Sequence, residues 1–453
     1  SLTIEGAGAG LTILDGQGGH RVLNVDTTSL VPFDFNAAIT IRGVTIPKGL
    51  NAGDGGGLYI QTNIASITVE DSVFLNNQAN DHAGGAYIFS NIGNIILTGN
   101  TFTDNSANSG GGVFILNAGG EMTLTNNTFS GNSAATTVGG AYIASMAGSA
   151  TLTGNTFSGN STLGGDYGGA MAMVIAGELV LTGNTFSGNT TAGGDGGGAA
   201  IGVTAGELCL TGNTFSGNSA MGGNNGGAMF MGMLASVSMS HNTFSGNAAT
   251  GNAGGAYFDL EEGSFSFADN SFSGNSAVVG GAGGAMFELT KMTSTLTNNT
   301  FTGNSAGMVG GGAYALVEEE RFTLTNNTFS GNSAVVRSGG LELALSGNST
   351  QADIYNNIFW ANTAPAPGAD LFILDDMPPD GVGAPVNLFH NNYGDFAIQI
   401  GDHLTQAGNI VNQDPLLTPD LHLQPGSPCI DAGDNAAPDL PAADFDGETR
   451  IMD

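Results

Sequence analysis

Basic residues are scarce in this sequence. Its 453 residues include 7 Lys+Arg against 39 Asp+Glu, which gives a formal net charge of -32 at pH 7. Nucleic acids and anionic membrane surfaces are bound through basic patches, so we expect no nucleic-acid partner. Such acidity favours solubility and cation binding, and it leaves few sites for trypsin-like proteases. We therefore expect a secreted protein that works outside the cell or at the cell surface.

Cysteine is scarcer still, with only Cys209 and Cys429 present. No C-x-x-C or C-x-x-C-H motif occurs, so an attached haem or a redox dithiol is not expected. The sequence has no apolar stretch long enough to span a bilayer, so we expect no direct membrane insertion. The chain begins at Ser1 directly in the strand-like sequence SLTIEGAG, which indicates a processed or trimmed piece of a longer secreted protein.

Glycine, by contrast, is abundant at 76 residues, and it is periodic, which indicates turns and close stacking. It belongs to a repeat whose clearest copies read LTNNTFSGNSA, at 124–134 and 324–334. A phenylalanine marks eleven copies, spaced 27 to 30 residues apart: Phe74, Phe102, Phe129, Phe157, Phe186, Phe215, Phe244, Phe272, Phe301, Phe329 and Phe359. A period this regular indicates one supersecondary unit stacked on itself as a solenoid.

An asparagine keeps a fixed distance from each of these phenylalanines, three residues later. Its copies are Asn77, Asn105, Asn132, Asn160, Asn189, Asn218, Asn247, Asn275, Asn304, Asn332 and Asn362. Around the phenylalanine the apolar residues alternate with polar ones, as Leu179, Leu181 and Phe186 do with Thr182 and Ser187. Period two is the signature of strands, and no stretch has a sustained helical period.

Three short strands and three turns per repeat predict an all-β solenoid of parallel strands. The phenylalanines are predicted to stack in an interior column, and the asparagines to form a hydrogen-bonded ladder at a corner. We expect about fourteen coils, roughly 65 Å of stacked strands at about 4.8 Å each. Residues 1–392 form the predicted β-helix, with clear repeats over 39–362 and an irregular coil over 363–392. Residues 393–453 are predicted to be an irregular C-terminal segment, either a cap or a linker.

Two resemblances follow from these motifs. The phrase NNTFSGNSA with a following GGAY is similar to the repeats of bacterial surface β-helix proteins related to the chlamydial polymorphic outer membrane proteins, over residues 39–362. The C-terminal sequences GNIVNQDPLL, LHLQPGSPCIDAGD and DFDGETR resemble the choice-of-anchor Q domain. These resemblances imply a right-handed parallel β-helix that is secreted and sorted to the bacterial cell surface. Neither implies a defined set of catalytic residues.

A polysaccharide lyase or glycoside hydrolase is the alternative, because many β-helix proteins act on polysaccharides. A hydrolase needs carboxylates that converge in a groove. The best cluster is Asp375, Asp376 and Asp380, on a proline-rich excursion, where solvated loop acids are the favoured interpretation. Trp360 and Tyr393 are the aromatic side chains that could either stack on sugars or pack inside.

Two groups of acidic residues are candidate calcium sites. Asp166 and Asp195 occupy equivalent turn positions of neighbouring coils, with Asp54 equivalent in an earlier one. Either they share a calcium ion, which suits such oxygen ligands, or their side chains splay apart in this variable turn. The tail carries a denser run, either a calcium-clamped cap or a flexible acidic linker: Asp431, Asp434, Asp439, Asp444, Asp446 and Glu448. No other cofactor is indicated.

The sequence therefore predicts a non-enzymatic structural β-solenoid, an adhesin, stalk or fibre subunit. Open solenoid ends present unpaired strand edges, which need caps or partners. Self-association along the axis, or contacts with surfaces and glycans, are the expected interactions. A carbohydrate-binding or carbohydrate-cleaving β-helix protein is the alternative function.

Overall fold

The computed structural model describes residues 1–29, 36–165, 167–222, 225–233, 236–347, 349–376, 383–399 and 403–449. Every regular element within those ranges is a β-strand, and no helix there could cross a membrane. The chain divides into two compact units, Ser1–Asn224 with Ala228–Phe230, and Asn225–Gly227 with Met231–Asp453. We call them the first and second units.

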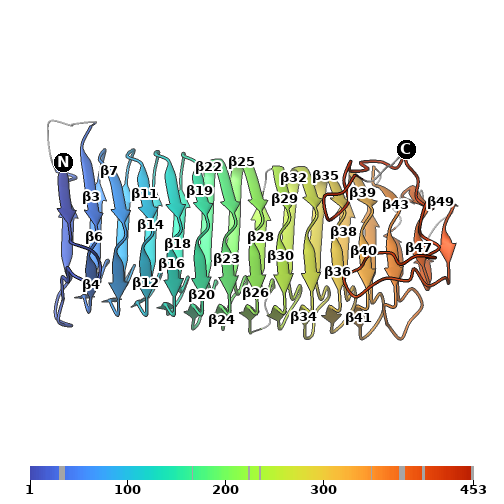
Figure 1. Ribbon diagram of the computed structural model, residues 1–453, viewed down its shortest axis with the longest axis horizontal. Helices are drawn as coiled ribbons and strands as arrows, with labels where there is room; N and C mark the ends of the chain where they lie inside the picture. The colour runs from blue at the N-terminus through green and yellow to red at the C-terminus, as the bar shows by residue number, and fades with distance from the viewer. Residues whose placement is uncertain are drawn as a thin grey trace. The chain divides into compact units, whose positions relative to one another are not determined.

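Each coil of the first unit runs through three parallel sheets in turn (Figure 1). The first sheet contains β1 (Leu2–Glu5), β2 (Leu23–Asp26), β3 (Ala38–Arg42), β6 (Leu58–Thr62), β7 (Ser66–Glu70), β10 (Ala86–Ser90), β11 (Ile95–Thr98), β14 (Val113–Asn117), β15 (Met122–Thr125), β18 (Ala141–Ser145), β19 (Ala150–Thr153), β22 (Ala170–Thr182) and β25 (Ala199–Thr211). The second contains β4 (Thr45–Pro47), β8 (Val73–Leu75), β12 (Thr101–Thr103), β16 (Thr128–Ser130), β20 (Thr156–Ser158), β23 (Thr185–Ser187) and β26 (Thr214–Ser216). The third contains β5 (Leu50–Asn51), β9 (Gln78–Ala79), β13 (Ser106–Ala107), β17 (Ser133–Ala134), β21 (Ser161–Thr162), β24 (Thr190–Thr191) and β27 (Ser219–Ala220).

The second unit repeats this plan, and β28 (Met229–Met233) lies at the division between the units. Its first sheet contains β29 (Ser236–Ser240), β32 (Ala256–Ala268), β35 (Ala285–Thr297), β38 (Ala313–Glu318), β39 (Arg321–Thr325), β42 (Leu341–Ser346), β43 (Gln351–Tyr355), β45 (Leu371–Asp376), β46 (Val386–Phe389), β48 (Phe396–Gln399) and β49 (Leu404–Ala407). Its second contains β30 (Thr243–Ser245), β33 (Ser271–Ser273), β36 (Thr300–Thr302), β40 (Thr328–Ser330), β44 (Ile358–Trp360), β47 (Asn392–Tyr393) and β50 (Ile410–Val411). Its third contains β31 (Ala248–Ala249), β34 (Ser276–Ala277), β37 (Ser305–Ala306) and β41 (Ser333–Ala334).

The predicted all-β solenoid with three sheets is confirmed, and most coils enter the first sheet twice, as β10 and β11 do. The described residues contribute 14 strands to the second sheet, one per coil, in agreement with the roughly fourteen coils predicted. The described coils of β44, β47 and β50 add no strand to the third sheet. Strands β48 to β50 pair in parallel with the preceding coil, so the β-helix runs past Asn392 to Val411.

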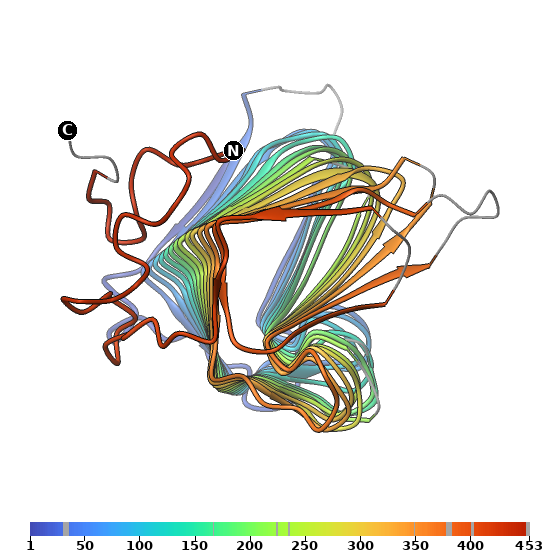
Figure 2. The same cartoon turned by 90° about the vertical axis from the view of Figure 1, so that its right-hand side faces the viewer.

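The predicted phenylalanine column lies inside. Phe129 of β16 and Phe157 of β20 are partners in register, both with no exposed surface, and their rings stack at 4.8 Å between centroids. Phe186 continues the stack at the same distance. The alternation of apolar and polar residues produces this arrangement, because Thr156 and Ser158 on either side of Phe157 point outward. Figure 2, along the axis of the coils, shows how closely successive coils superimpose within each unit.

The predicted asparagine ladder is confirmed as well. Asn132 Nδ2 donates to Asn160 Oδ1 at 3.0 Å and to the backbone oxygen of Phe102 at 2.9 Å, so each amide joins coils on both sides. These side chains are buried, and hydrogen bonds to neighbouring coils offset their desolvation.

A second ladder, which the sequence reasoning missed, lies two residues before each aromatic residue of the column, from Phe102 to Tyr393. Asn127 Nδ2 donates to Asn155 Oδ1 at 3.0 Å and to the backbone oxygen of Leu97 at 2.8 Å. Its described members continue through both units: Asn100, Asn127, Asn155, Asn184, Asn213, Asn242, Asn270, Asn299, Asn327, Asn357 and Asn391. The signal was present as the second asparagine of NNTF and the asparagine of GNTF.

A carboxylate terminates the first ladder. Asp370, which is 4% exposed, accepts from Asn362 Nδ2 at 2.8 Å through Oδ1. Its Oδ2 accepts from the backbone nitrogens of Gly394 at 2.8 Å and Asp395 at 3.0 Å. Burial raises the pKa of Asp370, and these hydrogen bonds partly oppose that rise. An acceptor-only group suits this position because donors approach it from both sides.

The glycine pair before each first-sheet strand marks a close approach between coils. A Cβ at Gly140 would lie 2.1 Å from the backbone oxygen of Gly169 in the next coil. No side chain fits at that distance, so the pair is a steric requirement of stacking.

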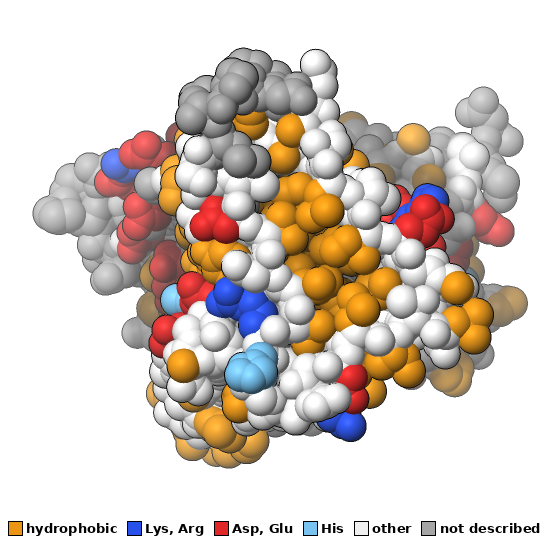
Figure 3. Space-filling view, turned by 90° about the vertical axis from the view of Figure 1, so that its left-hand side faces the viewer, with side chains coloured by type: hydrophobic (Ala, Val, Ile, Leu, Met, Phe, Trp, Pro, Cys, Tyr) orange, Lys and Arg blue, Asp and Glu red, His pale blue; other side chains and the backbone are white. Residues whose placement is uncertain are grey.

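The N-terminal end of the first unit presents apolar side chains (Figure 3). Leu11 is 78% exposed and Ile13 is 59% exposed. Strand β1 pairs with β3, and the described residues provide no strand for its other edge. This end therefore combines an open strand edge with exposed apolar surface.

Candidate functional site

One residue per coil has a positive φ at the turn from the first sheet to the second. In the second unit this position carries side chains, as at Asn298 (φ 56°), Asn326 (59°), Asn356 (57°) and His390 (55°). In the first unit several of the equivalent residues are glycine: Gly99, Gly154, Gly183 and Gly212. Asparagine and glycine both tolerate this conformation, so the turn is the same and only the side chain differs. The second unit thus presents an outward column of polar side chains, which we call the turn column.

The C-terminal tail, residues 412–449, lies against this turn column. Asn356 forms two hydrogen bonds with Asp434: its Nδ2 donates to the backbone oxygen at 3.0 Å, and its Oδ1 accepts from the backbone nitrogen at 2.8 Å. One coil later, His390 Nδ1 lies 2.9 Å from the backbone oxygen of Ala432. The column therefore holds the tail through backbone atoms.

The same pattern continues on earlier coils. Thr325 Oγ1 donates to the backbone oxygen of Pro438 at 2.8 Å, and Asn298 Nδ2 donates to that of Ala443 at 3.1 Å. The tail thus runs back along the second unit, opposite to the order of the coils, and Figure 2 shows it outside the sheets. Within the predicted irregular segment, residues 412–449 therefore pack along the side of the coils.

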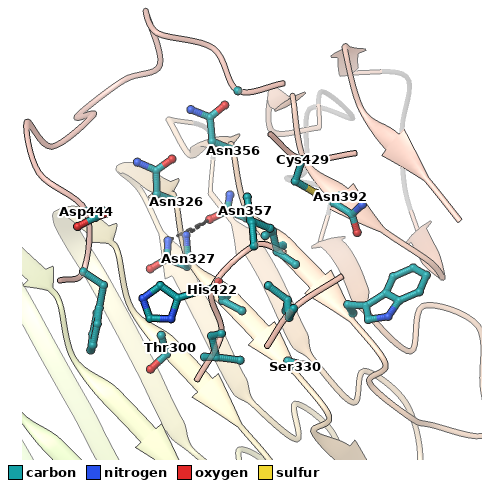
Figure 4. Close-up of a pocket in the computed structure, with 18 of the residues that line it drawn as sticks. Thr300, Asn326, Asn327, Ser330, Asn356, Asn357, Asn392, His422, Cys429 and Asp444 are labelled. Carbon is teal, nitrogen blue, oxygen red and sulfur yellow. Dashed lines mark hydrogen bonds between the residues drawn. The ribbon is translucent and has the colours of Figure 1, made fainter. Parts of the chain in front are cut away.

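A cleft of about 1410 Å³ lies between the tail and the outer face of the second sheet (Figure 4). The sheet provides a wall of hydroxyl groups and one indole: Ser271, Thr300, Thr302, Thr328, Ser330 and Trp360. The tail provides the opposite wall, which includes five carboxylates: Asp414, Asp420, Asp431, Asp444 and Asp446. This cleft is the candidate functional site.

Two amide atoms on the walls of the cleft have no hydrogen-bond partner among the described residues, Asn326 Nδ2 and Asn392 Oδ1. Asn392 is only 2% exposed, and its Nδ2 donates to the backbone oxygen of Gln413 at 3.0 Å. It lies beside Cys429: burial raises the pKa of that thiol, and hydrogen bonds from Ser427 and Asn392 partly oppose the rise. A buried polar atom without a partner is costly, so both atoms need explanation.

His422 joins two loops of the tail. Its Nε2 lies 2.6 Å from Asp446 Oδ2, and its Nδ1 lies 3.3 Å from Asp420 Oδ2. The hydrogen bonds to Asp446 and Asp420 raise the pKa of His422 above its ordinary value, because both carboxylates favour the charged imidazolium.

The predicted calcium ligands of the tail are partly brought together. Asp431, Asp444 and Asp446 line the cleft, whereas Asp434 lies at the turn column with Asn356. Asp444 Oδ1 accepts from the backbone nitrogens of Asp446 at 3.1 Å and Glu448 at 2.8 Å, which closes the loop locally. Within the part of the chain that the structure describes, no group of three or more His, Cys, Asp or Glu side chains could hold a metal ion. Calcium binding stays a prediction.

The other predicted calcium pair belongs to the first unit. Asp166 lies outside the described residues, and Asp195 is half-buried in the expected turn. The equivalent Asp54 binds a histidine: its Oδ1 lies 2.7 Å from His82 Nδ1.

Within the candidate hydrolase cluster, Asp375 is buried in a strand, contrary to the expectation of a solvated loop acid. Asp375 belongs to β45, is 5% exposed and accepts from the backbone nitrogen of Ala384 at 2.8 Å. It is placed inside because it pairs in register with Leu345 of the preceding coil. The backbone of Asp376 ends β45, and Asp380 lies outside the described residues. Of the two aromatic candidates, Tyr393 is buried and Trp360 lines the cleft.

Two arginines have carboxylate partners that the sequence reasoning did not find. Arg337 Nη2 lies 2.6 Å from Glu342 Oε1, and Arg321 Nε lies 2.6 Å from Asp353 Oδ2. The hydrogen bond with Glu342 raises the pKa of Arg337. Both carboxylates are buried, so these pairs neutralise acids within the first sheet of the second unit.

The family model of the right-handed β-helix region matches residues 35–230 and 184–359. The chain therefore belongs to the right-handed β-helix family. No curated protein matches the sequence.

Proposed function

We propose that this β-helix is a non-enzymatic structural protein, secreted or held at a cell surface as an adhesin, stalk or fibre subunit. The observation that carries the proposal is the continuous bonding between coils. In each repeat the phenylalanine, the two asparagines and the glycine pair contact neighbouring coils. Phe157, Asn155 and Asn160 are examples. Because the recurring residues of the repeat bind neighbouring coils, the sequence favours a structure that resists separation of its coils.

The resemblance of the NNTFSGNSA repeats to bacterial surface β-helix proteins supports the surface location, as does the resemblance of the tail to the choice-of-anchor Q domain. The net charge of -32 makes copies repel one another side by side, increasingly so at low ionic strength. Contact through the ends of the coils offers unpaired strand edges. We therefore propose that copies associate end to end.

The apolar N-terminal end supports this mode of association. Leu11 and Ile13 are exposed there, beside the open edge of β1. At the opposite terminus of the chain, β50 includes Val411, which is 44% exposed. Parallel pairing of β1 with the last coil of a second copy would cover both surfaces.

Negative-stain microscopy and sedimentation of the purified chain test the proposal. We expect particles that lengthen along one axis as the protein concentration rises. Leu11→Asp with Ile13→Asp should abolish that growth, because it places charge on the end. Leu163→Asp is the matched control, since Leu163 is 73% exposed in a turn of the first unit. Lateral sheets, or growth unaffected by the double variant, would contradict end-to-end association.

The non-enzymatic part of the proposal has a separate test. Pectin, alginate, chitin and cellulose oligomers are incubated with the protein, and new reducing ends or unsaturated sugars are measured. We expect no product above the blank. Release of product that disappears in Asp375→Asn would establish the alternative, a polysaccharide-degrading enzyme.

A further inference from the structure

We propose that the cleft between the tail and the second sheet binds a short oligosaccharide that is uncharged or carries amino groups. This inference goes beyond the structural role and does not depend on it. It rests on unpartnered polar atoms, on the composition of the two walls and on the pairing of the sheet strands behind one wall.

The two unpartnered atoms are one acceptor and one donor, and a ligand that both donates and accepts would satisfy them. Asn392 Oδ1 is an acceptor on a side chain that is 98% buried, and Asn326 Nδ2 is a donor. Asn326 belongs to the turn column, but its neighbours Asn298 and Asn356 bind the tail backbone while its own Nδ2 does not. Sugar hydroxyls both donate and accept, so one ligand class satisfies both atoms.

The sheet wall has the form of a ladder of hydroxyls. Thr300 and Thr328 are partners in register, as are Thr302 and Ser330, and Trp360 is the register partner of Ser330 on the next strand. Strand spacing places these groups about 4.8 Å apart, which suits the repeated hydroxyls of a linear sugar chain. The indole of Trp360 supplies the apolar surface against which a sugar ring packs.

The negative charge of the cleft determines which class of sugar it favours. Five aspartates line it, whereas no lysine or arginine is among its described lining residues. Its basic groups are imidazoles, and His422 is already paired with Asp420 and Asp446. An acidic sugar would be repelled, and an amino sugar would gain a carboxylate partner.

A peptide is a poorer fit, for a reason of backbone pairing. Peptides commonly bind sheets by adding a strand to a free edge. Strands β36, β40, β44 and β47 are paired in that order within the second sheet, so the wall offers side chains from a sheet face. Recognition through side-chain hydroxyls, amides and an indole favours a sugar.

Trp360 makes the test specific, because it is the single tryptophan of the chain. The probes are tetramers of N-acetylglucosamine, glucosamine and glucose, a tetramer of galacturonate and a trilysine peptide, each titrated against the full-length protein. We expect saturable changes in tryptophan emission with one or more of the first three. Galacturonate should bind at least roughly tenfold more weakly, because of the aspartates.

Asn326→Ala is the informative variant, because it removes the unpartnered donor from the wall of the cleft. It should weaken binding roughly tenfold, the usual loss for one buried hydrogen bond. Asn126→Ala is the matched control: Asn126 occupies the same turn position in the first unit, with φ 53°. Trp360→Ala is a second variant, and it should also weaken binding. Because it lacks the tryptophan, its binding is measured by calorimetry.

Several outcomes would overturn the proposal. These are no change in emission with any sugar at millimolar concentration, binding that Asn326→Ala and Trp360→Ala both leave unchanged, or tighter binding of galacturonate than of the uncharged sugars. Tighter binding of trilysine than of every sugar would assign the cleft to a basic peptide instead. Thermal melting of each variant shows whether a loss of binding reflects unfolding.

Discussion

Asn160 and Asn189 lie on neighbouring coils, and a single oxygen joins them. Both the backbone nitrogen and the Nδ2 of Asn160 donate to Asn189 Oδ1, at 2.9 and 3.0 Å. The remaining Nδ2 hydrogen of Asn160 goes to the backbone oxygen of Phe129 on the previous coil, at 3.0 Å. Each ladder position therefore satisfies backbone and side-chain groups on three consecutive coils.

Replacement of Asn160 by leucine should destabilise the first unit. It leaves a buried backbone nitrogen of the preceding coil without its acceptor, which costs about 1–3 kcal/mol. Denaturant unfolding and hydrogen exchange of the neighbouring coils measure the effect. Asn108→Leu is the control, because Asn108 is an exposed turn residue. A leucine variant at 160 as stable as that control would show that the ladder is dispensable.

Replacement of Phe157 by alanine removes a ring stacked on both sides. The cavity should cost about 3–5 kcal/mol in the free energy of unfolding. Phe114→Ala is the matched control: Phe114 stacks with Tyr142 at 4.3 Å, but on the half-buried outer face. We expect a smaller loss there, because water replaces the ring. Equal losses at the two positions would argue against a separate interior column.

Asp370→Asn should destabilise the last coils although the two side chains have the same shape. The amide would point a donor at the backbone nitrogens of Gly394 and Asp395, a cost of about 1–3 kcal/mol. Asp395→Asn is the control, because Asp395 uses only Oδ2, which accepts from Gly368 and Ala369. In Asp395→Asn the amide oxygen can take the place of Oδ2, so we expect a stability close to that of the parent protein. Hydrogen exchange over 383–411 separates the two variants.

The contact of His422 with its carboxylates should make the tail sensitive to pH. Its folded pKa is raised, so the stabilisation is complete below the unfolded value of about 6.5 and is lost as pH rises through the folded value. Hydrogen exchange of 417–449 should therefore be slower at about pH 6 than at about pH 9, after correction for intrinsic rates. In His422→Asn that difference should shrink. An unchanged difference in the variant would assign the effect to other groups.

The fold could be predicted from spacing because each repeat encodes its own contacts. Phe129 and Asn132 repeat at one coil length, and their places inside follow from period two and from the need to pair buried amides. The C-terminal limit of the β-helix was less accurate, because the coil of β50 lacks the sequence phrase and is recognised only by its strand pairing.

The candidate site could not be predicted in the same way. The tail binds through backbone atoms, such as the carbonyl of Ala443, which leave no mark on its side chains. The available signal lay in the turn column, where side chains are more frequent in the second unit than in the first: Asn326 carries a side chain where Gly183 has none, although Asn126 of the first unit carries one too. These side chains indicate a docking surface only once it is known that the tail runs back along the coils.

The ladders have a consequence for how the gene can change. Within the described ladders, neighbouring repeats are joined through equivalent atoms, as Asn132 and Asn160 are, so deletion or duplication of one whole repeat would rejoin identical bonds at the junction. Length could thus vary in whole coils through recombination between repeats, without compensating mutations. A shift by part of a repeat would instead place Phe157 or Asn160 out of register with both neighbours. The terminating Asp370 would stay last whatever the number of coils before it.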